Sequence, residues 1–193
     1  LLRKIPFWQT FLSWQNYLLN DILSFPTLYD IDSEDLKIMA YEFVLMRGKK
    51  TGAKPLELFE ASLAGNPEDI ITIGDKTYTM SILYYYLRYA YACNYINFDN
   101  IKIIVELGCG CGKQIEVIKK IYPDICFLLF DIPPQLYVCE QYLSAIFPDS
   151  VVSYNDTRNM ETLRKIQKGK IYIFGNWKFP IIENTEIDLF WNA

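Results

Sequence analysis

Apolar side chains recur every three or four positions through much of the first half of the chain, which is the spacing of an amphipathic helix. From Phe7 to Ile22 this pattern predicts one helix over about 7–23, and Pro26 ends it. The same spacing predicts a second helix over about 34–47. The chain therefore begins as a helical region.

A different pattern follows the second helix. Gly48–Gly52 contains two glycines and two lysines and predicts a loop. Two short runs rich in β-branched residues, Ile70–Ile73 and Lys76–Thr79, are separated by Gly-Asp and predict a β-hairpin with a two-residue turn. A long helix, rich in Tyr, is predicted directly after it over about 80–96.

From Ile101 onward, continuous apolar runs alternate with helical segments. The predicted strands are Ile103–Val105, Cys126–Phe130 and Val151–Tyr154, with further candidates at Ile171–Phe174 and Ile187–Phe190. The predicted helices are Gln114–Tyr122 and Pro134–Phe147. Apolar strands that alternate with helices are typical of a parallel sheet covered on both faces. We predict an α/β chain in two parts, with a mostly helical region and a small β-hairpin over 1–98 and a Rossmann-like sheet over 99–193.

Composition and charge exclude several classes of function. The 193 residues carry a formal net charge of −4, which argues against a nucleic-acid binder. Polar residues interrupt each apolar run before it reaches the length of a membrane span. The five Cys lack the spacing of a disulfide framework, so we expect reduced thiols and a cytoplasmic protein. Because the chain has no His, any acid–base chemistry within it falls to Asp, Glu, Lys, Tyr or Cys.

The segment that carries chemistry is Val105–Gly112, where the first strand of the predicted sheet turns into a helix. Its glycines allow a sharp turn and bring backbone N–H groups close to a ligand at the positive end of that helix. Asp131 ends the next strand. In a doubly wound sheet these two places are neighbours, and a carboxylate there accepts hydrogen bonds from the hydroxyls of a ribose. The pattern predicts a nucleoside-binding site.

The spacing of the glycines indicates which nucleoside. A dinucleotide fingerprint, G-x-G-x-x-G, would need Gly in the place of Lys113. Positions 106–112 read E-x-G-x-G-x-G instead, which strongly resembles motif I of the class I S-adenosylmethionine (SAM) methyltransferases, with Asp131 matching their ribose-binding acid. The resemblance implies SAM as cofactor and S-adenosylhomocysteine as product, with the methionine part near the glycine loop and the adenine near 152–156. The cofactor-binding residues that it implies are Glu106, Gly108, Cys109, Gly110, Gly112, Asp131, Ile132, Asn155 and Asp156.

A narrower resemblance covers about residues 80–193. Phe130–Leu136 reads F-D-I-P-P-Q-L and Gln141–Ser144 reads Q-Y-L-S. Together they look like the D-[IL]-P … Y-L-S signature of the putative sugar O-methyltransferase family, which also has a helical N-terminal part and a fourth strand followed by Asn, here Asn192. The resemblance implies O-methylation of a sugar or another small-molecule hydroxyl. It identifies no catalytic base, and we predict no metal site.

Other interpretations of these residues stay open. A SAM-binding or interaction module without turnover fits the same motifs, and a nicotinamide-dependent oxidoreductase fits them less well because of Lys113. Arg88, on the helix before the first strand of the sheet, is a candidate contact to the cofactor's carboxylate. The basic residues between Arg47 and Lys54 favour a solvated loop over a phosphate site. Cys109 and Cys111 favour small space-filling roles over redox chemistry.

The last predicted strand gives an expectation about the extent of the domain. In the class I fold that the motifs resemble, further strands lie beside the fourth strand, which here is Ile187–Trp191. Without them this strand would form an open apolar edge, which soluble proteins avoid. We therefore expect either that the SAM-binding domain continues beyond the sequence, or that a second copy of the chain covers this edge.

Overall fold

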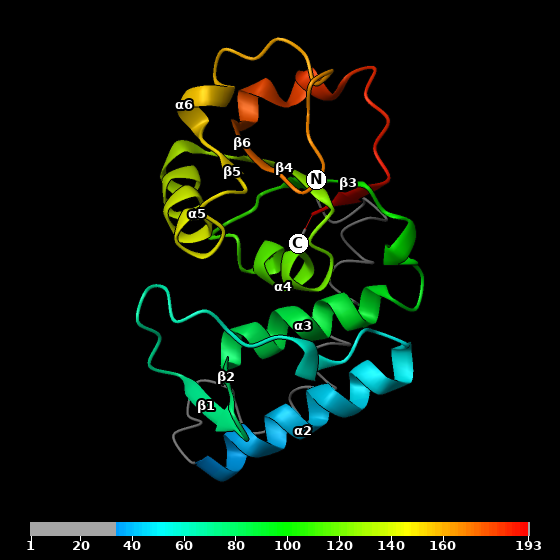
Figure 1. Cartoon of the computed structure of the whole chain (residues 1–193), viewed down its shortest axis with the longest axis vertical. Helices are drawn as coiled ribbons and strands as arrows, with labels where there is room; N and C mark the ends of the chain where they lie inside the picture. Colours follow the sequence, from blue (N-terminus) through cyan, green and yellow to red (C-terminus); the bar gives the residue numbers. More distant parts are fainter. Residues whose placement is uncertain (1–33, 193) are drawn as a thin grey trace, which may run out of the picture. The chain divides into compact units, whose positions relative to one another are not determined.

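The computed structural model describes residues 34–192, and the helix predicted over 7–23 lies outside them (Figure 1). From Ala40 onward the chain forms one compact unit. The first described helix, α2, spans Glu34–Thr51. The predicted boundary between residues 98 and 99 stays a prediction.

Helix α2 continues through most of the segment that we predicted as a loop at Gly48–Gly52, so that prediction is wrong as far as Thr51. The cause is a tertiary contact. A Cβ atom at Gly48 would collide with the hydroxyl of Tyr86, so the glycine lets another helix approach closely. The helix ends where Gly52 takes a left-handed conformation, with φ +70°.

The hairpin is confirmed at the predicted positions. β1 (Ile70–Ile73) pairs antiparallel with β2 (Lys76–Thr79). The next helix, α3, spans Met80–Ala92 and begins at once, because the side chain of Thr79 accepts a hydrogen bond of 3.1 Å from the backbone N–H of Ile82. Two short 3-10 helices, η2 (Leu56–Leu58) and η3 (Phe98–Asn100), lie before the hairpin and after α3.

The Tyr-rich stretch of α3 forms core. Tyr86 and Tyr89 are fully buried, and each has a partner for its hydroxyl, as buried tyrosines require. The hydroxyl of Tyr86 donates to the carbonyl of Lys54 at 2.8 Å, and those of Tyr89 and Tyr122 share a hydrogen bond of 3.0 Å. Since Tyr122 directly follows α4 (Lys113–Ile121), these contacts hold α3 against α4.

The second half of the chain is a mixed α/β arrangement, compatible with the Rossmann-like fold that we predicted. Its five strands are all parallel, in the order β5-β6-β4-β3-β7. They are β3 (Ile103–Leu107), β4 (Cys126–Asp131), β5 (Val151–Val152), β6 (Ile171–Gly175) and β7 (Leu189–Trp191). The connections contain α4, α5 (Pro133–Ile146), α6 (Tyr154–Thr157) and the 3-10 helix η4 (Asn176–Ile182).

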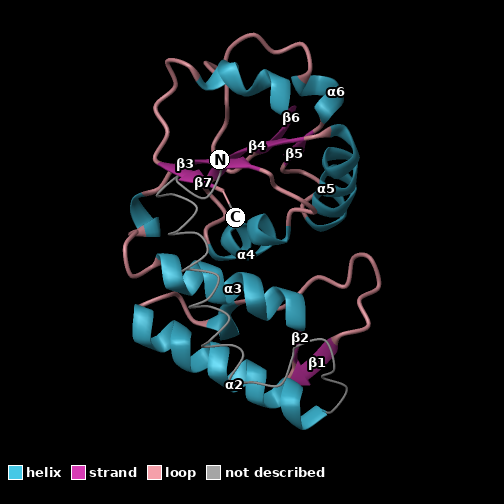
Figure 2. Ribbon diagram, turned by 180° about the vertical axis from the view of Figure 1, so that it is seen from behind, coloured by secondary structure: helices cyan, strands magenta, loops and turns pink. Residues whose placement is uncertain are grey.

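The sheet is covered on both faces, as its uninterrupted apolar strands predict. Figure 2 shows α4 on one side of it and the segment after β6 on the other. Alternate strand residues, among them Val105, Leu128 and Phe174, pack with Leu163 and with apolar side chains of η4. The other set, which includes Ile104 and Glu106, therefore points to the face on which α4 lies.

The place of β6 could not be predicted from the sequence. The strand predicted over Val151–Tyr154 is shorter in the structure, where β5 spans Val151–Val152 and α6 begins at Tyr154. It is the third strand of this sheet along the chain, but the neighbour of β4 is β6, and β5 lies outside it. All five residues of β6 are buried, whereas β5 has two half-buried residues. The longer apolar run therefore takes the interior position and leaves the short one at the edge.

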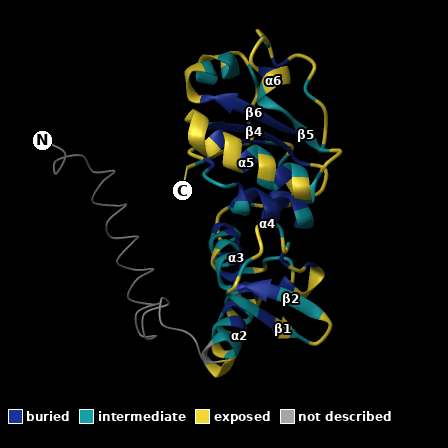
Figure 3. Cartoon of the chain, turned by 90° about the vertical axis from the view of Figure 1, so that its left-hand side faces the viewer, coloured by how far each residue is buried: buried dark blue, intermediate teal, exposed yellow. Residues whose placement is uncertain are grey.

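Burial is concentrated in the central strands, which appear dark blue in Figure 3, while α5 presents one exposed face. β7 lies at the other edge of the sheet, with Phe190 half exposed. Among the helices of the described residues, none combines the length and the apolar character needed to cross a bilayer. Whether the domain continues beyond β7 stays a prediction.

Candidate functional site

The glycines of the loop between β3 and α4 have two different roles. Gly110 and Gly112 both have a left-handed backbone, with φ +55° and +85°. A Cβ atom at Gly108 or Gly110 would meet no atom within 4 Å, whereas one at Gly112 would lie 2.9 Å from Leu143 and 3.1 Å from Cys139. The first two glycines therefore face open space at the carboxyl end of β3, and the third allows α5 to pack against the loop.

Asp131 lies directly beside this loop, as the sequence predicts. Its Oδ2 accepts a hydrogen bond of 2.9 Å from the N–H of Gly110, and its Oδ1 accepts one of 2.8 Å from the N–H of Ile132. A carboxylate can accept about four hydrogen bonds. Asp131 therefore joins the ends of β3 and β4 and keeps acceptor capacity for hydroxyl groups of a ligand.

Glu106, the last residue but one of β3, is a buried carboxyl that lacks a full set of partners. Its exposed fraction is 2%, and its Oε2 has no hydrogen-bond partner in the described part of the chain. Burial raises the pKa of Glu106 to about 8; the positive charge of Arg88 opposes the rise, and the negative charge of Asp131 adds to it. A buried polar atom without a partner is rare and points to a ligand or to strain.

Helix α3 contacts the residues that directly follow the glycine loop. The ammonium group of Lys113 donates to the hydroxyl of Ser81 at 2.6 Å, and the side-chain amide of Gln114 donates to the carbonyl of Tyr85 at 3.4 Å. The other side-chain atom of Gln114, Oε1, is buried and has no partner among the described residues. The first turn of α4 is thus fixed to the first half of α3.

The thiols near the loop are packed. Cys109 and Cys139 are buried, with 3.7 Å between their sulfur atoms. The hydrogen bond to Cys139 and burial both raise the pKa of Cys109, so little thiolate is present. Since the thiolate is the reactive form of cysteine, these contacts favour the space-filling role over redox chemistry.

The structure gives the other predicted cofactor residues different surroundings. Ile132 is 49% exposed, at the beginning of α5. Asn155 and Asp156 lie in α6, which follows the edge strand β5. Because β6 lies between β5 and β4 in the sheet, the end of β5 is further from Asp131 than the end of β6. Asp156 also accepts a hydrogen bond of 2.6 Å from Ser153, which caps that helix. The assignment of these residues to the cofactor stays a prediction.

Two residues that the sequence analysis did not select lie at the end of β6. Gly175 is in register with Asp131, and a Cβ atom there would collide with the ring of Trp177. Trp177 is 54% exposed, and the ring of Tyr154 packs against it edge-on, with 6.2 Å between the two ring centroids. The sequence does contain a signal for this position, a Gly directly after the apolar run Ile171–Phe174. That Gly lies beside Asp131 only because β6 pairs with β4, and this strand order was not predicted.

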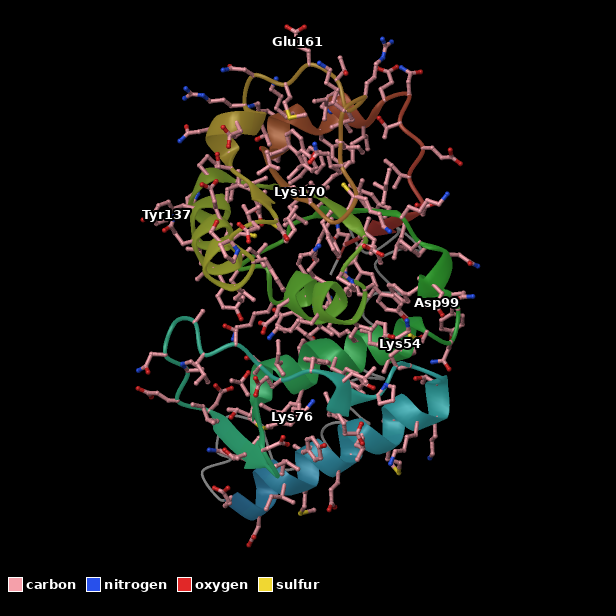
Figure 4. The ribbon with its side chains drawn as sticks, in the orientation of Figure 1. Lys54, Lys76, Asp99, Tyr137, Glu161 and Lys170 are labelled. Carbon is pink, nitrogen blue, oxygen red and sulfur yellow. The ribbon has the colours of Figure 1, made fainter. Side chains whose placement is uncertain are left out.

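The basic residues between Arg47 and Lys54 have different surroundings. Lys54 forms an ion pair of 2.8 Å with Asp99 at the surface (Figure 4), while Lys49 and Lys50 are exposed. Within residues 34–192, no group of three or more Cys, Asp or Glu side chains is arranged to hold a metal ion. The carboxyl edge of β3 and β4 is therefore the candidate site.

No protein-family model matches the chain, and no curated protein matches it significantly.

Proposed function

We propose that the protein is a SAM-dependent methyltransferase that transfers a methyl group to a hydroxyl of a sugar or another small molecule. One observation carries the proposal. The glycine loop and Asp131 are joined through the Gly110 N–H, and the space above Gly108 and Gly110 is open. This is the arrangement that a nucleoside with a ribose next to the loop requires.

The residues present fit SAM. The carboxylate of Asp131 accepts the ribose hydroxyls, and the glycines let the backbone approach the ligand closely. Glu106, with its unpartnered oxygen, lies where the resemblance to motif I puts the methionine part. When bound, SAM supplies a sulfonium methyl group that is already activated, so the protein's task is mainly to align the acceptor oxygen with it.

The resemblance of Phe130–Leu136 to the sugar O-methyltransferase signature supports the choice of acceptor. A hydroxyl acceptor loses its proton during or after attack, and a nearby base assists this. Since the chain has no His, a base within it would be an Asp, Glu, Lys, Tyr or Cys.

Calorimetric titration tests the cofactor assignment. The chain is titrated with S-adenosylhomocysteine and, separately, with NAD. We expect one molecule of S-adenosylhomocysteine to bind and NAD to give no heat of binding. Binding of NAD alone would support a nicotinamide-dependent enzyme and contradict the proposal.

A turnover assay then separates an enzyme from a binding module. The protein is incubated with SAM carrying a labelled methyl group and a panel of sugars and nucleotide sugars. We expect label to enter a carbohydrate hydroxyl. Cofactor binding without transfer to any member of a broad hydroxyl panel would favour a SAM-binding module.

A further inference from the structure

One loop outside the candidate site is basic, although the protein as a whole is acidic. Residues 158–170 join α6 to β6 and form neither helix nor strand (the orange loop in Figure 1). The stretch 158–178 has one acidic residue, Glu161, in a chain whose formal net charge is −4. Its basic residues are Arg158, Arg164, Lys165, Lys168, Lys170 and Lys178. Long loops without regular structure are uncommon and often functional.

The loop presents its cations on three successive turns. In each turn a backbone N–H donates to the carbonyl three residues earlier. The closing hydrogen bonds run from Met160 to Thr157 (2.9 Å), from Ile166 to Leu163 (3.2 Å) and from Lys170 to Gln167 (3.3 Å). The central positions of the turns hold four exposed cations, which are Arg158, Arg164, Lys165 and Lys168.

Apolar side chains at the ends of the turns fix the loop to the core. Leu163 is buried in the core on the η4 face of the sheet, and Met160 and Ile166 pack against that core. The cations therefore project from an ordered backbone. Binding to them orders side chains only, which keeps the entropy cost of association low.

Three of the four cations have no partner within residues 34–192. Arg158, Arg164 and Lys165 form no ion pair or side-chain hydrogen bond there. Lys168 pairs with Asp124 at 2.8 Å, but both side chains are exposed, so the pair is weak. Like charges without partners repel one another, and an anion relieves that repulsion.

The turns follow an extended path over the protein. Thr157, in the first turn, donates to the carbonyl of Ile173 in the middle of β6. Gly169, in the third turn, donates at 2.9 Å to the carbonyl of Asp124, before β4 begins. A small anion would contact only one of these turns. The partner that fits all of them is an extended chain with negative charges at intervals.

We propose that the basic strip, formed by Arg158, Arg164, Lys165 and Lys168, binds an anionic carbohydrate chain whose carboxylate or sulfate groups face the cations. This rests on the proposed function and names its acceptor as a sugar unit within an anionic oligosaccharide.

The first turn connects the basic strip to the carboxyl end of β6. The N–H of Arg158 donates to the carbonyl of Tyr154 at 2.9 Å, and the ammonium of Lys178 donates to the carbonyl of Met160 at 3.0 Å. Lys178 directly follows the half-exposed Trp177, whose ring offers apolar surface to the C–H groups of a sugar. A carbohydrate chain on the strip therefore extends to the edge of the sheet where Asp131 lies.

Two other kinds of polyanion fit the strip less well. Duplex nucleic acid carries one charge per about 1.7 Å, and three unpaired cations neutralise little of it. An anionic membrane is a flat surface, and Glu161 points outward at the end of the molecule where this loop lies (Figure 4). Its carboxylate would be pressed against the negative lipid headgroups.

Calorimetric titration at low salt tests the proposal. The ligands are an oligogalacturonate, with a carboxylate on each sugar, a heparin-derived oligosaccharide, with sulfates, and a neutral oligosaccharide of the same length. The test variant combines Arg158→Gln, Arg164→Gln and Lys165→Gln. The control variant removes the same charge from exposed positions elsewhere, through Lys49→Gln, Lys50→Gln and Lys102→Gln.

We expect wild type and the control variant to bind an anionic oligosaccharide but not the neutral one. Added salt should weaken this binding, because it screens exposed charges. The test variant should bind about tenfold or more weakly, the combined effect of three exposed charge contacts. If the test variant does not fold, Arg164→Gln and Lys165→Gln are measured singly, and each should weaken binding in the same direction.

Three results would overturn the inference. They are equal binding by wild type and the test variant, no binding of either anionic oligosaccharide to wild type, and tighter binding of wild type to single-stranded DNA or to phosphatidylserine vesicles than to both oligosaccharides. S-adenosylhomocysteine should bind equally to wild type and both variants. Its failure to bind wild type would contradict the proposed function, whatever the oligosaccharides do.

Discussion

Two buried carboxyl groups on neighbouring elements have opposite surroundings. Glu116, in the middle of α4, is completely buried and accepts hydrogen bonds from the N–H of Ser62 and the ammonium of Lys120, each at 2.7 Å, and from the hydroxyl of Tyr142. Glu106, at the end of β3, is almost as buried, but its Oε2 has no partner among the described residues.

The difference separates a group that supports the fold from one that is available to a ligand. The three donors of Glu116 come from the loop after η2, from α4 and from α5, so this carboxylate connects three segments. A buried charge with such partners is costly to disturb. Among residues 34–192, Oε2 of Glu106 joins no other segment. A place where a buried polar group lacks a partner is where function is expected.

The largest expected effect is on stability. Glu116→Gln removes the charge that pairs with Lys120, and we expect it to lower the free energy of unfolding by about 3 kcal/mol. Glu106→Gln should leave that free energy unchanged or raise it, because an amide is buried without the proton that Glu106, with its raised pKa, takes up on folding. Urea unfolding of both variants measures the difference. Equal losses would show that the two carboxyls have the same role.

A second comparison uses the glycine loop. Left-handed φ angles mean that a side chain at Gly110 or Gly112 costs about 1–2 kcal/mol of stability in either case. Gly112→Ala should cost more, because its Cβ would press on Leu143 and Cys139. Gly110→Val should stay folded and weaken S-adenosylhomocysteine at least a hundredfold, or about 2.8 kcal/mol. Normal ligand binding by Gly110→Val would mean that the loop is only a turn.

Asp131→Ala should weaken S-adenosylhomocysteine by about 1.5–3 kcal/mol, the range for hydrogen bonds to a charged acceptor. Part of that loss comes from the glycine loop, because Asp131→Ala also removes the acceptor of the hydrogen bond from the N–H of Gly110. Asp131→Asn keeps an acceptor oxygen for that N–H and separates the two contributions. Calorimetry on both variants measures them, and an unchanged dissociation constant in Asp131→Ala would remove the ribose assignment.

A further expected effect is that the free energy of unfolding depends on pH. Because the pKa of Glu106 is raised to about 8 in the folded chain, from 4.5 for an ordinary Glu, the folded state holds an extra proton between these values. Stability from this group is complete below about pH 4.5 and falls as the pH rises to 8, by at most about 1.4 kcal/mol per pH unit. Glu106→Gln should remove this slope from urea unfolding measured at several pH values. An identical slope in wild type and variant would assign it to other groups.

Much of the fold could be predicted because its signals are local. The hairpin was predicted from two β-rich runs and a Gly-Asp turn, and β3 and β4 from apolar runs next to helical segments. The continuation of α2 through Gly48 and the position of β6 in the sheet could not be predicted in this way. The helix through Gly48 depends on the approach of Tyr86, and the position of β6 depends on competition with β5 for the neighbourhood of β4.

The candidate site shows the same division. The meeting of Gly110 with Asp131 was predictable, because strand ends in a parallel sheet share one edge. The sequence did not show that Gly112 packs against α5 while Gly110 faces open space, since both are glycines of one motif. Nor did it show the place of Trp177, which depends on where β6 joins the sheet.

The most direct test of the central claim is the affinity of Glu106→Gln for S-adenosylhomocysteine. The control is Glu161→Gln, whose side chain points into solvent at the surface (Figure 4). Calorimetric titration should show that wild type and control bind alike, while Glu106→Gln keeps its melting temperature and loses about tenfold or more in affinity. A Glu106→Gln variant that binds as tightly as wild type would contradict the claim that this carboxyl is reserved for the ligand.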